Sequence, residues 1–166
     1  TLGEKRGLAQ RLADSDDHPA NVVADGMLVA FVVSALLALF FWLVPAPMFP
    51  GGQYSEIDRL MVLAIPPLAL TEIWLAALAY RYNIGATVRA RAVVEPWTLS
   101  IMAGVMIFVA PDSGLSVAYL VSIYAASLAA LVPFLKTYGL PQAWRPRPSA
   151  LGRLTLRSLP IAGADA

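Results

Sequence analysis

Four long apolar segments constrain this chain more than any other feature of its sequence. They cover approximately residues 21–44, 60–80, 93–110 and 115–135. A predominantly apolar run of about 20 residues is long enough to cross the hydrocarbon core of a bilayer as a helix. A helix also satisfies its backbone hydrogen bonds internally, which lipid requires. The sequence therefore predicts an all-α, polytopic bundle of transmembrane helices.

The composition supports a single membrane domain over residues 1–166. Hydrophobic residues make up 58% of the chain and charged residues 14%, against about 45–50% and about 25% in soluble domains. The polar ends predict short interfacial helices at about 5–13 and 150–158. Because the chain begins without Met and ends in a new apolar segment, we expect a fragment with four complete spans and the start of a fifth.

The basic residues predict the orientation of the spans. Eleven of the twelve Lys and Arg residues lie at the two ends or in the segment 81–92, which is expected to be a turn, and only Arg59 lies elsewhere. By the positive-inside rule, both ends and the 81–92 turn are predicted to be cytoplasmic. The loops 45–59 and 111–114 would then face outward from a cell (inner) membrane.

The second span contains two features that are costly in lipid. Pro66 and Pro67 remove the helical hydrogen bonds to two carbonyls one turn earlier, so a kink beside a hydrated space is expected. Glu72 follows near mid-depth, where carboxylates usually face a bundle interior or a water-filled cavity. The alternative for Glu72 is a buried hydrogen bond to a neighbouring helix.

A second carboxylate, Glu95, opens the third span beside Pro96. At 1.5 Å per residue, Glu72 would lie roughly 12 Å and Glu95 roughly 3 Å above the cytoplasmic ends of their helices, a vertical separation of about 9 Å. That separation suits a cation or a protonation switch rather than a carboxyl pair. Alternatively, Glu95 pairs with Arg91 four residues earlier or caps its helix.

Three arginines, Arg81, Arg89 and Arg91, are candidates for a cationic mouth that binds a phosphate-bearing substrate, because guanidinium groups match phosphate oxygens. Their alternative role is topology alone. The stripe Ala118, Ser122, Ala126, Ala130 in the fourth span predicts a packing face, and Ser100 and Gly104 would allow close helix approach.

Few residues point to catalysis. The only acidic cluster, Asp14, Asp16 and Asp17, is explained by a helix N-terminus, and the single histidine, His18, cannot build a metal site alone. The chain contains no cysteine and no Walker-type phosphate loop. We therefore predict no enzyme, no catalytic residues, no metal, no cofactor and no nucleic-acid partner.

Three segments resemble the bacterial polysaccharide and lipid-linked oligosaccharide exporters of the multidrug/oligosaccharidyl-lipid/polysaccharide (MOP) flippase superfamily. They are LGEKRGLAQRLA before the first span, AYRYNIGATVRARAVVEPWTL leading into the third, and RLTLRSLPIAGADA at the end. The resemblance implies helices three to six of a six-helix lobe that, with a second lobe, encloses a cationic cavity. It also implies no bound cofactor.

From the residues and this resemblance we expect part of a membrane transporter that exports a lipid-linked oligosaccharide or polysaccharide precursor. Its partners would be the lipid bilayer, an anionic lipid-linked saccharide and the remaining helices of the full-length protein. The first alternative is a structural or accessory membrane subunit without transport activity. The least favoured is a fragment of a membrane glycosyltransferase or phosphotransferase.

Overall fold

A computed structural model of the chain describes residues 19–49, 51–52 and 54–140, and all regular structure in this part is helical. Segment η1 is a 3₁₀-helix and η2 is a π-helix. The predicted interfacial helices at 5–13 and 150–158, and the start of a fifth span, lie outside the described residues. The elements in chain order are α2 (Pro19–Leu43), α3 (Glu56–Arg59), η1 (Leu60–Ala64), α4 (Ile65–Tyr80), α5 (Ile84–Thr87), η2 (Val88–Val94), α6 (Glu95–Val109) and α7 (Gly114–Tyr138).

Several of these elements are continuous, so the described chain contains four helices that are long and apolar enough to cross a membrane. Their bounds are Asn21–Leu43, Glu56–Tyr80, Ile84–Val109 and Gly114–Tyr138. The prediction of an all-helical fold is confirmed for the described residues, and four of the helices are long and apolar enough to cross a membrane.

Two helices begin earlier than predicted. The second begins at Glu56 because Ser55 caps it: the Ser55 side chain accepts from the backbone N–H of Asp58, whose carboxylate accepts from the Ser55 backbone. The third begins at Ile84 instead of near residue 93, so the predicted turn 81–92 shrinks to 81–83. Arginine interrupts an apolar run but is a good helix former. The arginines therefore limited the apolar segment in the sequence without limiting the helix.

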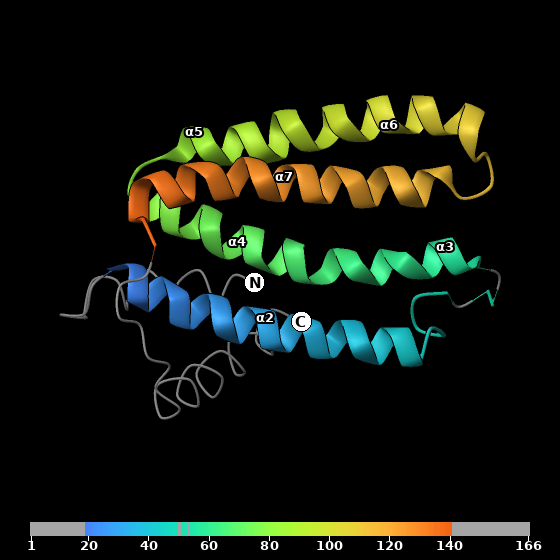
Figure 1. Ribbon diagram of the computed structural model, residues 1–166, viewed down its shortest axis with the longest axis horizontal. Coiled ribbons are helices and arrows are strands. Elements are labelled where there is room, and N and C mark those ends of the chain that lie inside the picture. Colours follow the sequence, from blue (N-terminus) through green and yellow to red (C-terminus); the bar gives the residue numbers. More distant parts are fainter. Residues whose placement is uncertain (1–18, 50, 53, 141–166) are drawn as a thin grey trace.

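The four long helices lie side by side in one layer, in the order α6, α7, α4, α2 (Figure 1). Each helix therefore packs mainly on its neighbours in the row, and large apolar side chains are exposed on all four helices. Fully apolar outer positions include Leu36 on α2 and Phe108 on α6, which are 61% and 88% exposed. Such a layer requires lipid or further helices against these side chains.

Helix α7 supplies the best-packed face of the layer. The predicted stripe Ala118, Ser122, Ala126, Ala130 is buried, which confirms it as a packing face. At the start of α7, a Cβ built on Gly114 would come 2.6 Å from the Met106 Cβ, so α6 and α7 approach closely there. By contrast, Ser100 and Gly104 are exposed, and no described neighbour approaches the Cβ position of Gly104.

The core is concentrated at the end of the layer that contains the 81–83 turn. There Trp74 of α4 stacks on Phe134 of α7, and Phe134 stacks on Tyr138. The buried Tyr138 hydroxyl donates to the carbonyl of Ala77 at 2.6 Å. At the opposite end, Arg59 donates to the Trp42 carbonyl at 2.6 Å and lies over the Trp42 ring.

Candidate functional site

The candidate site is built where η2 passes into α6. Pro96 lacks an N–H and its ring would crowd the carbonyl one turn earlier in a regular α-helix. The helix is wider immediately before this proline: the backbone N–H of Glu95 bonds to the carbonyl of Ala90, five residues back. Such π turns occur frequently at functional sites. Arg91 lies at the centre of this π segment and Glu95 directly follows it.

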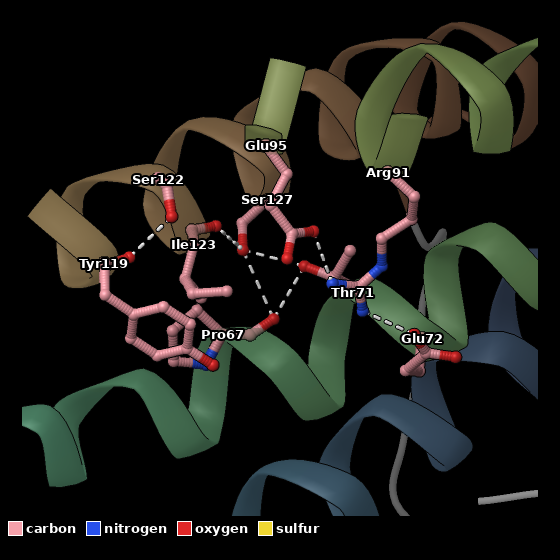
Figure 2. A network of polar contacts seen from close by, with 9 residues as sticks. All are labelled: Pro67, Thr71, Glu72, Arg91, Glu95, Tyr119, Ser122, Ile123 and Ser127. Atoms are coloured by element: carbon pink, nitrogen blue, oxygen red, sulfur yellow. Dashed lines mark hydrogen bonds and ion pairs between the residues drawn. The ribbon is translucent and has the colours of Figure 1, made fainter. Parts of the chain in front are cut away.

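Three charged side chains meet at this position. Arg91 Nη1 donates to Glu95 Oε2 at 2.7 Å, and Arg91 Nη2 donates to Glu72 Oε1. Figure 2 shows Arg91 reaching from its helix toward Glu72 on α4. We call Glu72, Arg91 and Glu95 the charged cluster. It joins the second and third long helices through side chains that are 19 residues apart in the sequence, those of Glu72 and Arg91.

The charged cluster is partly open and carries one more negative than positive group. The side chains of Glu72 and Arg91 are each 27% exposed, and that of Glu95 is 24% exposed. Charged groups inside apolar helices are costly unless they are paired or hydrated. The guanidinium fork can engage two carboxylates at once because its donors are fixed in one plane. A bound cation or a proton could neutralise one of the two carboxylates in place of Arg91.

A second polar group surrounds the prolines of α4. The Leu63 carbonyl, which loses its helical donor to Pro67, accepts from the Tyr124 hydroxyl of α7 at 3.3 Å. The Pro67 carbonyl accepts from Thr71 at 2.7 Å and from Ser127 of α7 at 3.3 Å. The Thr71 and Ser127 hydroxyl oxygens lie 2.7 Å apart (Figure 2). The Tyr124 hydroxyl thus replaces the donor that the Leu63 carbonyl loses to Pro67, as lipid requires.

This packing differs from the hydrated kink that the sequence predicted. Thr71 is only 1% exposed and Ser127 only 6%, because α7 covers them. The chain passes from the 3₁₀-helix η1 directly into α4 at Pro66 and Pro67. Within the described residues, protein atoms rather than an open cavity surround the Thr71 side of the kink.

The three predicted arginines do not form one group. Arg91 is engaged by two carboxylates, whereas Arg81 lies over the ring of Tyr138 with its guanidinium carbon 5.6 Å from the ring centre. Arg89 is exposed, and none of the hydrogen bonds or ion pairs of the described chain involves it. The alternative role of Glu95, an ion pair with Arg91, is present in the structure. Glu72 pairs with the same arginine, which lies on the neighbouring helix.

Sequence reasoning missed the residues that hold the helices together around the site. Tyr124 replaces a donor that Pro67 removes on another helix, Ser127 donates to the Pro67 carbonyl, and Ser116 donates to Asp58 at the far end of the layer. A hydroxyl in each helix was visible in the sequence, but nothing in the sequence aligns α4 with α7. Among the described residues, no group of three or more His, Cys, Asp and Glu side chains is arranged to hold a metal ion.

An apolar groove lies apart from the charged cluster. It has a volume of about 340 Å³ and is formed by α2, α4 and α7, with Phe31, Leu70 and Phe134 among its lining residues. The groove offers hydrocarbon contacts and almost no polar atoms. It therefore has no group that would bind a phosphate or a sugar.

Comparisons with known proteins add no relative: no family model matches the sequence, and no curated protein or solved structure is significantly similar to it.

Proposed function

We propose that this chain is part of a membrane transporter that exports a lipid-linked oligosaccharide or polysaccharide precursor across the cell membrane. The observation that carries the proposal is the charged cluster of Glu72, Arg91 and Glu95, set within helices that are long and apolar enough to cross a membrane. Ionisable residues at such positions mark substrate or ion pathways more often than structural sites. The substrate class rests on the resemblance of the sequence to flippases.

The charged cluster is suited to responding to ions. One guanidinium is shared by two carboxylates, so protonation of either carboxylate, or arrival of a cation, would leave Arg91 with a single partner. Because Glu72 lies on α4 and Glu95 at the start of α6, the choice of partner would couple the second and third long helices. This arrangement supports coupling of transport to an ion gradient.

The substrate phosphates would be bound elsewhere. Two carboxylates already occupy Arg91, and an anionic substrate would have to displace one of them. Arg81, in the turn of the same helical hairpin, and Arg89, two residues before Arg91, are exposed and have no carboxylate partner among the described contacts. We therefore assign anion attraction to Arg81 and Arg89 and ion sensing to the charged cluster.

The alternative is a structural membrane subunit, and one observation favours it. The same contacts that suit ion sensing also tie α4 to η2 and α6, as a purely structural ion pair would. A structural pair predicts that loss of a partner lowers protein abundance, because an unpaired buried charge remains. A functional carboxylate predicts lost transport at normal abundance.

The test replaces Glu72 by Gln and by Leu in the complete reading frame that contains this chain. Each variant is expressed in an export-deficient strain, and polysaccharide export and membrane abundance are measured together. We expect Glu72→Gln to accumulate normally and to lose export, because Gln retains hydrogen bonding but not charge. Glu56→Gln, which alters an exposed carboxylate at the first residue of α3, is the matched control. Full export by Glu72→Gln would refute the assignment.

A further inference from the structure

The third long helix buries positions that are four residues apart. Ala86 and Ala90 are buried, and half-buried positions continue along the helix every four residues at Val94, Thr98 and Met102. A regular α-helix advances about 100° per residue, so a four-residue spacing drifts by about 40° at each step. Three steps, from Ala86 to Thr98, would turn the packed face by about 120°, away from α7.

The π-helix η2 corrects this drift. A π turn accommodates one additional residue, which is worth about 100° of rotation. With this turn between α5 and α6, the faces around Ala86 and around Thr98 differ by only about 20°. Both faces can then pack on the rest of the layer.

The same alignment could be reached with one residue fewer. If one residue of η2 were absent, Ala86 and Thr98 would be separated by one position less, and a regular α-helix would also leave the two faces about 20° apart. Packing therefore does not explain the additional residue. What the wide turn does change is the direction of the residues inside it, and Arg91 is the central residue of η2.

We propose that η2 contains one residue that the packing of the bundle does not require, and that its wide turn is a positioning element that sets Arg91 between Glu72 and Glu95. Pro96 is part of the same positioning element, because it disfavours a regular α-helix in place of the wide turn. The geometric part of this inference is independent of transport, and its link to export rests on the proposed function.

The test deletes Val93, an exposed residue of η2, and replaces Pro96 by Ala so that a regular helix can form. We expect this variant of the complete protein to accumulate normally. Spin labels on Cys introduced at Val105 of α6 and Leu128 of α7, both exposed, should give an unchanged distance by pulsed EPR. Deletion of Ile101, an exposed residue in the regular part of α6, is the matched control and should reduce abundance severely.

The position of Arg91 is read out separately. In the wild type and in Pro96→Ala, Glu72→Gln should lower the unfolding temperature by about 2–4 °C. Gln can still accept a hydrogen bond from Arg91, but the negative charge that pairs with the guanidinium is lost. In the deletion background the same substitution should have almost no effect. An undiminished effect of Glu72→Gln there, or a shifted α6–α7 distance, or abundance as low as that of the Ile101 deletion, would each overturn the inference.

Export distinguishes this inference from the proposed function. If the deletion variant keeps its packing, loses the effect of Glu72→Gln and no longer exports, both ideas are supported. If it keeps its packing, loses that effect and still exports normally, the positioning role of η2 stands and the role of the charged cluster in transport fails.

Discussion

At the scale of single residues, hydroxyl groups matter as much as charges in this protein. Thr71 is buried and satisfied by the Pro67 carbonyl within its own helix and by Ser127 of α7. A threonine that only bonds to its own helix tends to bend it slightly and adds little stability. The additional contact with Ser127 makes Thr71 a link between α4 and α7 at the point where the prolines weaken α4.

Replacing Thr71 by Val should therefore destabilise the protein by about 0.5–2 kcal/mol. The substitution keeps the shape of the side chain but removes the hydroxyl that bonds to Pro67 and Ser127, and it leaves Ser127 with the Ile123 and Pro67 carbonyls. Thermal unfolding in detergent measures the effect. Thr137 provides the control, since it donates to the Pro133 carbonyl at 2.8 Å in the same way but is exposed. Equal behaviour of Thr71→Val and Thr137→Val would show that the contact between helices contributes nothing.

At the scale of elements, close packing is concentrated in α7, and α6 contributes no fully buried residue. The contact of Gly114 with Met106 is the point that fixes the start of α7 against the end of α6. Glycine is required at position 114 because a side chain would overlap Met106, and not because of an unusual backbone conformation. The turn between them, residues 110–113, is held by the Gly114 N–H, which donates to the Ala110 carbonyl at 2.7 Å.

We expect Gly114→Ala to destabilise the protein by about 1–3 kcal/mol, because the new methyl group would overlap the Met106 Cβ and push α6 from α7. The matched variant is Gly104→Ala on α6, where a Cβ would meet no atom within 4 Å. That variant should be neutral or slightly stabilising, since alanine is the better helix former. Comparable losses in unfolding temperature for the two variants would contradict the proposed role of the contact.

The elements also show how far sequence reasoning reaches. Apolar length predicted the four long helices, and the four-residue stripe of small residues predicted the packed face of α7. The early start of the third helix was missed because Arg89 and Arg91 were assigned to the turn that precedes it. The π-helix η2 was missed as well, because the same four-residue spacing also occurs in the regular helix α7 and therefore does not identify a π turn. The pairing of Thr71 with Ser127 depends on how two helices align, which no local pattern encodes.

At the scale of the whole molecule, the long helices of the described chain lie in a row, and large apolar side chains are exposed on each of them. Its charged residues gather toward the ends and at the charged cluster. Of the five Lys and Arg residues in the described part, Arg59 lies near one end, whereas Arg81, Arg89, Arg91 and Lys136 lie toward the other. This distribution accords with the predicted orientation, which remains a prediction.

A topology experiment tests that orientation. A reporter fused after Tyr82, in the turn between α4 and α5, should behave as cytoplasmic, and one fused after Gly52 should behave as external. Each fusion is compared with the same reporter fused after Asp112, in the turn between α6 and α7, which should match the Gly52 fusion. The reverse pattern would contradict the orientation and, with it, the placement of Arg81 and Arg89 on the side from which substrate is taken.

The central claim is that the charged cluster serves transport of a lipid-linked saccharide, and vesicle reconstitution tests it most directly. The complete protein and its Glu72→Gln variant are purified, incorporated at equal density into vesicles, and supplied with a fluorescent lipid-linked oligosaccharide. Its movement between leaflets is then followed by quenching. The account predicts that the wild type moves the lipid faster than protein-free vesicles do and that Glu72→Gln abolishes the difference. Wild-type vesicles that match protein-free ones, or a variant that matches the wild type, would contradict it.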